Sequence, residues 1–307
     1  IHFMNDEVKG LLLSFVGGCN ARVTSRSAYG GLQDVFADPD VWEQFSSRAH
    51  VNVLRFVHTT VRSEAEIPCY SGLIGTCWAT LFVSAGYTVC LYDISSTQLD
   101  ASRQTILKYL QQLRSDGLSR GSITVEEATK LITTTSTLSE ALSNAIYAQE
   151  STCEDVEFKK RIFVEMDLCV SSSTILASST STIPASKFTG TLTHRYHRSQ
   201  CLVVHPVNPP LYLALVEIVP APWTKDETVK KAYAIMKDIG QEPVHLHREV
   251  LGFAVNRLQY ALLAEAWRLV ENDVLSTEDV DKVMSAGLGP RYAIHGPLET
   301  AHLNANG

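Results

Sequence analysis

Two residues that lie close in the sequence have the side chains of an acid–base pair. His205 opens the segment His-Pro-Val-Asn-Pro-Pro, and Glu217 ends the later segment Leu-Val-Glu. Imidazole titrates near neutral pH and can take a proton from a hydroxyl group, while a neighbouring carboxylate orients the ring and stabilises its cation. Such a pair suits the oxidation of a secondary alcohol, in which hydride leaves for a nicotinamide ring. Taken alone, a histidine at a strand end is more often a hydrogen-bonded structural residue.

A glycine-containing turn earlier in the chain has the spacing of a dinucleotide site. The run Ser-Gly-Leu-Ile-Gly at residues 71–75 leads into an apolar helix face, and residues 87–93 follow as an expected strand that ends in an acid. Glycine lets backbone N–H groups at a helix start approach a pyrophosphate, and an acid about twenty residues later accepts the ribose hydroxyls. The acid repels a 2′-phosphate, which predicts NAD rather than NADP. The candidate cofactor residues are Gly72, Leu73, Ile74, Gly75 and Asp93.

The turn departs from the dinucleotide pattern on its N-terminal side. Tyr70 stands where the first glycine is expected, and residues 65–69 include Pro68. Proline cannot donate to a strand ladder and is rare in central strands, whereas the strand before such a turn is central. Residues 51–57 are a second strand candidate, which would reach the turn only through a long loop. By itself, so short a motif has a high false-positive rate.

From residue 87 onward, short apolar strands alternate with helix-like segments. The alternation predicts an α/β fold with a doubly wound, Rossmann-type parallel sheet. Residues 96–116 have helical periodicity, Thr124 with Glu127 forms a capping box for another helix, and a third helix follows Cys153 and ends near Asp167. The expected strands cover residues 87–93, 145–150, 174–179, 200–207 and 213–219.

The pattern becomes helical after Pro220. Residues 226–237 and 252–272 have the periodicity of helices, and Ser276 with Asp279 predicts the cap of a third helix. The last ten positions stop without the helices needed to cover so apolar a surface, so we expect a smaller, truncated all-α domain. The expected domains are an unassigned extension over residues 1–66, a nucleotide-binding domain over 67–220 and the helical domain over 221–307.

Composition restricts the classes of partner. The chain has 307 residues, is 45% hydrophobic and 19% charged, and carries a formal net charge of −7. Nucleic acids and anionic membranes favour basic surfaces, so neither is an expected partner. The seven cysteines include no C-x-x-C pair, which favours reduced thiols in the cytoplasm and no metal site. The longest early apolar run, at residues 11–16, is too short to span a bilayer. A small molecule is the expected partner.

Several separated motifs, in order, resemble the 3-hydroxyacyl-CoA dehydrogenase family. The segment from His205 to Pro210, followed by Val216 and Glu217, resembles the H-x-x-N-P…V-E segment of that family. Its double proline is similar to the lambda-crystallin or L-gulonate 3-dehydrogenase branch. The resemblance extends from Gly72 to the end of the chain without large gaps. Its other motifs lie at residues 177–181, 252–258, 265–268 and 287–293.

The resemblance implies a catalytic pair, three further cofactor contacts and two substrate contacts. The catalytic pair is His205 and Glu217. The cofactor contacts are Asn208, Glu154 and Lys159, and the substrate contacts are Ser181 and Asn256. Each assignment outside the catalytic pair has a structural alternative. Ser181 could cap the following helix, Asn256 could be an interior amide, and Glu154 with Lys159 could form a solvated helix face.

The substrate class depends on the helical domain. Arg291 lies in one of the motifs that resemble the lambda-crystallin branch, and its planar guanidinium suits a small carboxylate. We therefore expect NAD-dependent oxidation of the 3-hydroxyl of a small hydroxy acid such as L-gulonate. A surface ion pair is the alternative for Arg291. The alternative functions are a 3-hydroxyacyl-CoA dehydrogenase and a catalytically impaired, crystallin-like structural protein. The resemblance also implies a homodimer formed through the helical domain.

Overall fold

The computed structural model describes residues 53–57, 71–119, 123–192 and 195–305. These residues divide into two compact units. The first, which we call the sheet unit, ends at Val255, and the second, the helical unit, begins at Asn256. Each unit is described by itself.

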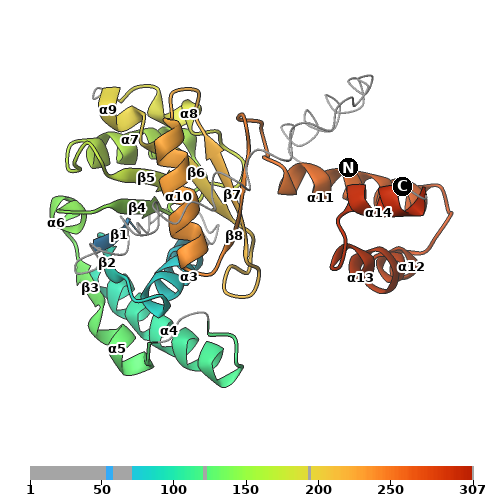
Figure 1. Ribbon diagram of the computed structural model, residues 1–307, viewed down its shortest axis with the longest axis horizontal. Coiled ribbons are helices and arrows are strands. Elements are labelled where there is room, and N and C mark those ends of the chain that lie inside the picture. The colour runs from blue at the N-terminus through green and yellow to red at the C-terminus, as the bar shows by residue number, and fades with distance from the viewer. Residues whose placement is uncertain (1–52, 58–70, 120–122, 193–194, 306–307) are drawn as a thin grey trace. The chain divides into compact units, whose positions relative to one another are not determined.

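The sheet unit is built on one eight-stranded sheet with the order β3-β2-β1-β4-β5-β6-β7-β8 (Figure 1). Neighbouring strands from β3 to β6 are parallel, whereas β7 is antiparallel to β6 and parallel to β8. The predicted Rossmann-type sheet is confirmed, but its last two strands are reversed, because the short loop at residues 207–214 can join only antiparallel neighbours. The strands are β1 (Val53–Val57), β2 (Thr88–Tyr92), β3 (Ile132–Thr135), β4 (Tyr147–Glu150), β5 (Ile175–Ser178), β6 (Cys201–Pro206), β7 (Leu215–Pro220) and β8 (Glu242–His245).

Strand β1 occupies the centre of the sheet. It pairs in parallel with β2 on one side and β4 on the other. The strand candidate at residues 51–57 is therefore present over its described part, residues 53–57, and the segment with Pro68 lies outside the described residues. Strands β2 and β3 extend the sheet from one side of β1, and β4 to β6 extend it from the other. Such a switch in strand order, between β1 and β4, is where open α/β sheets bind ligands at the carboxyl ends of their strands.

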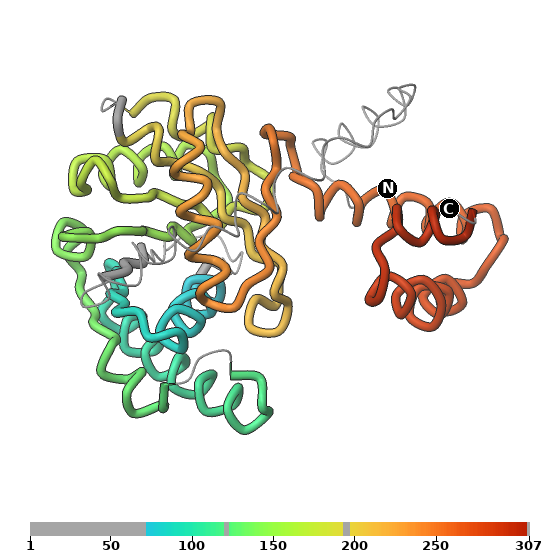
Figure 2. Tube along the Cα trace, viewed as in Figure 1, coloured from blue at the N-terminus to red at the C-terminus, as the bar shows by residue number. Residues whose placement is uncertain are grey.

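Alternate residues of the strands face two separate cores, one on each side of the sheet. In β2, Val89 and Leu91 belong to one apolar cluster, and Cys90 and Tyr92 belong to the other. Successive side chains of a strand point to opposite faces, so both faces need cover. Helices α3 (Ser71–Ser84), α4 (Ser96–Ser115), α5 (Val125–Lys130) and α10 (Asp226–Asp238) supply it on the first face, and α6 (Leu138–Leu142), α7 (Val156–Asp167) and α8 (Ser186–Thr189) on the second (Figures 1 and 2).

Side-chain caps fix the starts of the connecting helices where the sequence indicated. At α5, the backbone N–H of Glu127 donates to Thr124 Oγ1 at 3.2 Å, and the N–H of Thr124 donates to the Glu127 carboxylate at 2.8 Å, which confirms the capping box. At α7, the N–H of Phe158 donates to Asp155 at 2.7 Å. These caps satisfy N–H groups that have no partner inside the helix. A short helix, α9 (Arg195–Arg198), precedes β6.

The sheet unit continues past the domain boundary predicted at residue 220. Strand β8 pairs with β7, and the apolar side of α10 packs into the same core as α3 and α4. A boundary at residue 220 would separate these elements from the core that buries them. The unit therefore reaches Val255.

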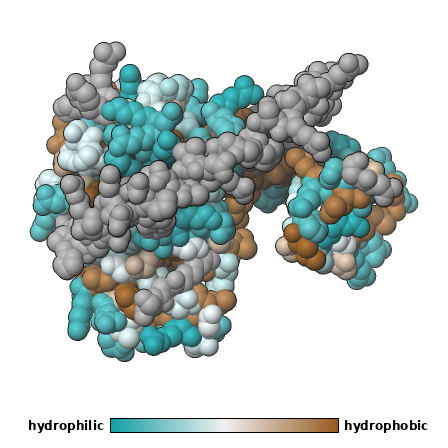
Figure 3. Space-filling view, in the orientation of Figure 1, coloured by the Kyte–Doolittle hydropathy of each residue, from teal (hydrophilic) through white to brown (hydrophobic). Residues whose placement is uncertain are grey.

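The helical unit contains α11 (Val255–Glu271), α12 (Thr277–Lys282), a π-helical segment η1 (Val283–Leu288), α13 (Gly289–Tyr292) and α14 (Pro297–Asn304). The predicted cap of α12 is confirmed, because the N–H of Asp279 donates to Ser276 Oγ at 3.1 Å. No described side chain of α11 is buried, and Leu258 and Trp267 are 67% and 61% exposed. Apolar residues lie at the surface of this unit (Figure 3). Among the helices of the described residues, none is long and apolar enough to cross a bilayer.

Candidate active site

His205 and Glu217 meet across the antiparallel strands β6 and β7. The two residues are directly opposite each other in the strand register, and His205 Nδ1 lies 2.8 Å from Glu217 Oε2. Residues opposite each other in an antiparallel pair present their side chains on the same face of the sheet, which explains the contact. The His205 ring also packs against Phe253, with ring centroids 5.7 Å apart. The structure therefore brings the predicted catalytic pair together.

The Glu217 carboxylate is fully buried and has partners for both oxygens. While Oε2 faces His205, Oε1 accepts hydrogen bonds from the backbone N–H groups of Ala254 at 2.8 Å and Val255 at 2.9 Å. Burial by itself raises the pKa of this carboxyl, but the hydrogen bonds from His205 and from the backbone hold the pKa below its usual value. An ionised carboxylate only accepts hydrogen bonds, so Nδ1 of a neutral His205 carries the proton and Nε2 has the free lone pair. That tautomer is the one a general base requires.

The predicted glycine turn lies at the amino end of α3. Gly72 is in the first turn of the helix, Gly75 is buried in the next, and Leu73 and Ile74 lie between them, with Leu73 exposed. The carbonyl of Gly72 accepts a hydrogen bond from Thr76 Oγ1 at 2.7 Å. A helix start that lacks side chains at its glycines leaves backbone N–H groups open to a phosphate.

Asp93 directly follows β2, the strand beside β1. It is fully buried, and its Oδ1 accepts a hydrogen bond from the N–H of Ser95 at 2.8 Å, which fixes the direction of the carboxylate. In dinucleotide-binding sheets, the ribose is recognised by an acid at the carboxyl end of the strand beside the first strand. Together with the amino end of α3, Asp93 fits the dinucleotide that the sequence predicts. Tyr70, which replaces the first glycine, lies outside the described residues.

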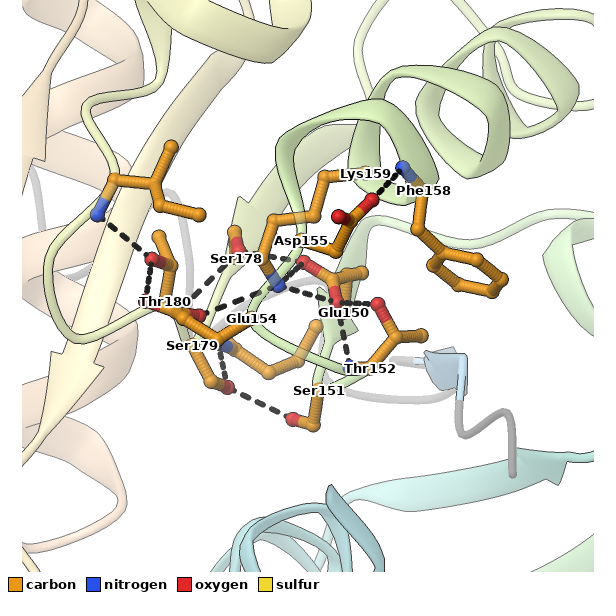
Figure 4. Close-up of polar contacts among 12 residues, drawn as sticks. Glu150, Ser151, Thr152, Glu154, Asp155, Phe158, Lys159, Ser178, Ser179 and Thr180 are labelled. Carbon is orange, nitrogen blue, oxygen red and sulfur yellow. Dashed lines mark hydrogen bonds and ion pairs between the residues drawn. The ribbon is translucent and has the colours of Figure 1, made fainter. Parts of the chain in front are cut away.

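A buried ion pair joins the end of β4 to α7 (Figure 4). Lys159 Nζ donates to both oxygens of Glu150, at 2.9 and 3.0 Å, and neither side chain is more than 1% exposed. Burial alone raises the pKa of Glu150, but Lys159 and the hydroxyls of Ser178 and Thr152 hold the pKa below its usual value. Lys159, predicted to contact the cofactor, thus has an internal partner, and its contact with the cofactor stays a prediction.

Glu154 and Ser181, predicted for the cofactor and for the substrate, lie in contact with each other. The N–H of Ser181 donates to Glu154 Oε1 at 3.0 Å, and the Ser181 hydroxyl lies 3.4 Å from the same oxygen. Glu154 lies before α7, and Ser181 lies in the loop after β5. The carboxyl ends of neighbouring parallel strands meet at one edge of a sheet, which brings the two residues together.

The remaining predicted residues are exposed or belong to the helical unit. Asn208 is exposed and lies two residues after the end of β6, where a cis peptide bond joins it to Pro209. Asn256 is half-buried near the start of α11, and Arg291 is exposed on α13. The roles of these three residues stay predictions.

Sequence reasoning missed a second polar network at the same edge of the sheet. Trp78 Nε1 donates to Ser179 Oγ at 3.1 Å, Gln149 Nε2 donates to it at 2.7 Å, and Ser151 Oγ lies 2.8 Å from it. Since tryptophan and the amide nitrogen only donate, the Ser179 proton points to Ser151. The signal was available in the sequence, because Gln149 and Glu150 are polar residues in an otherwise apolar strand. Buried polar side chains require partners.

Family models match the chain in two consecutive parts. The NAD-binding domain of 3-hydroxyacyl-CoA dehydrogenase matches residues 70–250, and the C-terminal domain of 3-hydroxyacyl-CoA dehydrogenase matches residues 252–307. The chain belongs to the 3-hydroxyacyl-CoA dehydrogenase family. Its cofactor is therefore NAD, and its chemistry is that of an oxidoreductase, as the sequence predicted.

Individual relatives refine this assignment. The lambda-crystallin homolog of Homo sapiens is 48% identical over 237 residues, which are 77% of this chain and 73% of the relative. The L-carnitine dehydrogenase of Staphylococcus epidermidis is 32% identical over 233 residues, covering 76% of this chain and 70% of the relative. The crystal structure of a 3-hydroxyacyl-CoA dehydrogenase from Archaeoglobus fulgidus has a TM-score of 0.64 at 29% identity, covering 82% of this chain and 74% of that one. The first similarity identifies the lambda-crystallin branch of the family.

Proposed function

We propose that this member of the family oxidises the 3-hydroxyl of a small hydroxy acid, such as L-gulonate, to the 3-oxo acid. The contact between His205 and Glu217 is the observation that carries the proposal. The carboxylate holds Nδ1–H, so Nε2 is free to take a proton. The proton of the substrate's hydroxyl passes to Nε2 while hydride leaves the same carbon, and a carbonyl group forms. Bound NAD supplies the acceptor for the hydride.

Glu217 has a second effect on the reaction. When His205 takes the proton, the imidazolium that forms lies 2.8 Å from a buried carboxylate. Opposite charges interact more strongly in a buried site than in water, so Glu217 stabilises the cation. This stabilisation needs no movement of the protein, because the carboxylate is already in place.

We assign NAD to the carboxyl edge of the sheet. The amino end of α3, at residues 72–75, would face the pyrophosphate, and Asp93 would accept the ribose hydroxyls. By the family resemblance, Asn208 would lie beside the nicotinamide and Lys159 would contact the cofactor. For Glu154, the cofactor contact implied by the resemblance competes with a second role, the positioning of the loop that holds Ser181.

The relatives include both substrate classes, because an L-carnitine dehydrogenase and a 3-hydroxyacyl-CoA dehydrogenase are each 32% identical to this chain. One residue favours a small acid over an acyl-CoA. Arg291, which is exposed on α13, offers a planar guanidinium suited to a carboxylate. Ser181 and Asn256 would contact the hydroxyl or carbonyl oxygen of the substrate.

We further propose a cytoplasmic homodimer. The exposed apolar side chains of α11 need a partner surface, and the helical unit of a second copy would supply one. The cysteines of the described residues form no disulfide, in keeping with a reducing compartment.

Steady-state kinetics with three matched proteins test the proposed function. Wild type is expected to reduce NAD with L-gulonate, and His205→Ala is expected to lose about 10²- to 10⁴-fold in kcat while it still binds NADH. His247→Ala is the control, because His247 is exposed on the segment after β8 and has no place in the proposed site. Full activity of His205→Ala would exclude the proposed base.

Acetoacetyl-CoA, assayed in the reductive direction, separates the two substrate classes. Turnover of acetoacetyl-CoA with none of L-gulonate would replace the small acid by a 3-hydroxyacyl-CoA, with the same catalytic pair. A protein that binds no NADH and turns over neither compound would be the structural alternative.

A further inference from the structure

The middle of the loop after β5 is held by one carboxylate oxygen. We call residues 179–182 the Ser181 loop. The oxygen is Glu154 Oε1, and Figure 4 shows that it points from the segment before α7 toward the loop. Its donors are Thr180 Oγ1 at 2.5 Å, Ser181 N at 3.0 Å, Thr182 N at 3.1 Å and Thr182 Oγ1 at 3.1 Å, with Ser181 Oγ at 3.4 Å.

The other side of the loop is fixed as well. Ser178, at the end of β5, donates to Glu150 at 2.5 Å, and Ser179 is bound by Trp78 and Gln149. Thr180 is buried, and its Oγ1 also accepts a hydrogen bond from the N–H of Ile183 at 2.9 Å. Hydrogen bonds to a charged group are the strong ones, so Glu154 is the principal anchor of the middle of the loop.

The remaining oxygen of Glu154 faces protein too. Glu154 Oε2 lies 3.8 Å from Lys159, whose ammonium is already bonded to both oxygens of Glu150. Because Glu150 fixes the Lys159 ammonium, Lys159 attracts Glu154 Oε2 while it stays bonded to Glu150. The Glu154 side chain is nevertheless 39% exposed, so it stands at the edge of the site.

We propose that Glu154 is a positioning residue that acts through Ser181, and that its contribution to the reaction is the placement of the Ser181 hydroxyl on the substrate. This inference rests on the proposed function and deepens it, because Ser181 is there a substrate contact. A polar group that is fixed before the substrate arrives needs no reorganisation during the reaction, and a misplacement of about 1 Å can cost about 10²-fold in rate. The cofactor contact that the family resemblance implies for Glu154 is the competing role, and it predicts instead that NADH binding weakens in step with kcat/KM.

A double-mutant cycle tests the proposal. Glu154→Ala and Ser181→Ala are each expected to lower kcat/KM for the hydroxy acid by about 10- to 100-fold, since the first displaces the Ser181 hydroxyl and the second removes it. In the Ser181→Ala protein, the further change Glu154→Ala is expected to add less than about threefold, because residues that act as a unit are not additive. Glu154→Gln keeps an acceptor oxygen and should retain more activity than Glu154→Ala. Glu157→Ala is the control, since Glu157 lies on the exposed side of α7 and pairs only with Lys160 among the described residues.

Fluorescence titration of NADH separates placement of the loop from contact with the cofactor. The Kd of NADH is expected to stay within about twofold of wild type in Glu154→Ala, while the kinetic loss falls on the hydroxy acid. A rise of the Kd for NADH in proportion to the loss of kcat/KM overturns the proposal. Additive losses in the cycle overturn it as well, because they mean that Glu154 and Ser181 act separately.

Amide hydrogen exchange gives a readout that needs no turnover. A peptide that contains residues 179–183 is expected to exchange faster in Glu154→Ala than in wild type, and at an intermediate rate in Glu154→Gln, while peptides of β6 and β7 are unchanged. If no hydroxy acid is turned over, the proposed function fails, and the exchange rates still decide whether Glu154 holds the loop. Equal exchange in wild type and Glu154→Ala overturns the inference whether or not the protein is active.

Discussion

The substitution Glu217→Gln tests the orientation of His205 with almost no change of shape. In the native protein Glu217 Oε1 accepts two backbone N–H groups and Oε2 accepts His205 Nδ1–H. The amide of glutamine has one oxygen and one NH₂ group, so its oxygen can accept hydrogen bonds either from the backbone N–H groups or from His205 Nδ1–H, and not from both.

The backbone side is expected to take the amide oxygen. If the NH₂ group faced Ala254 and Val255, two hydrogen bonds would be lost and N–H donors would face each other, at a cost of about 1 kcal/mol for each lost hydrogen bond. With the oxygen on the backbone, NH₂ faces His205, whose Nδ1 must then accept and whose Nε2 carries the proton. Even about 2 kcal/mol favours this inactive tautomer roughly 30-fold.

The expected loss of kcat/KM is larger than the tautomer alone requires. The amide also removes the charge that stabilises the imidazolium, so the total should reach about 10²- to 10⁴-fold, within the range for loss of a general base. The assay is kcat/KM for the hydroxy acid, with NADH binding and thermal unfolding measured in parallel. Glu242→Gln is the matched control, because Glu242 is exposed on the neighbouring strand β8 and pairs with Lys237. A Glu217→Gln protein that retains more than about a tenth of wild-type kcat/KM would refute this account.

Three further predictions concern the carboxylates of the site. Lys159→Met leaves Glu150 buried without its cation, and urea unfolding should show a loss of about 3 to 5 kcal/mol, much of it restored by adding Glu150→Gln. Lys159 and two hydroxyls keep the pKa of Glu150 below its ordinary value of 4.5 despite burial. The stability that this group contributes is therefore complete above pH 4.5 and is lost as the pH falls through the lower pKa of the folded state. Acid unfolding titrations of wild type and Glu150→Gln should show this difference, and identical curves would contradict it. Asp93→Ala removes the acid at the end of β2, so the ratio of kcat/KM with NADP to that with NAD should rise, and an unchanged ratio would mean that Asp93 does not recognise the ribose.

The sequence predicted the interior of the sheet better than its edges. The strands expected near β2, β4, β5, β6 and β7 are present, because each is a short, mainly apolar segment that is buried on both faces. The two strands that were missed, β3 and β8, are the outermost strands of the sheet. Strand β3 exposes two threonines, and β8 contains Pro243, which an edge strand tolerates because its free side needs no donor. An edge strand therefore lacks the pattern by which a central strand is recognised.

The candidate site was predictable where a local rule sets the geometry. Strand register places His205 opposite Glu217, and the caps at Thr124 and Ser276 follow from side chains that satisfy free N–H groups. The partner of Lys159 was not predictable, because Glu150 comes from a different element and is buried only once the sheet has formed. The contact of Glu154 with Ser181 also depends on how two loops after parallel strands meet, which spacing along the chain does not encode.

The two roles of Glu217 affect how sequences of this branch are compared. Its Oε1 holds the backbone at Ala254 and Val255, where the chain leaves the sheet, and this duty remains in a protein that has lost its chemistry. Purifying selection for folding alone is thus expected to keep the glutamate, whereas the proton-accepting chemistry of the imidazole opposite it is needed only by the reaction. A homologue that retained the acid but replaced the histidine would be a folded pseudoenzyme, so position 205 is the better genomic marker of an active member.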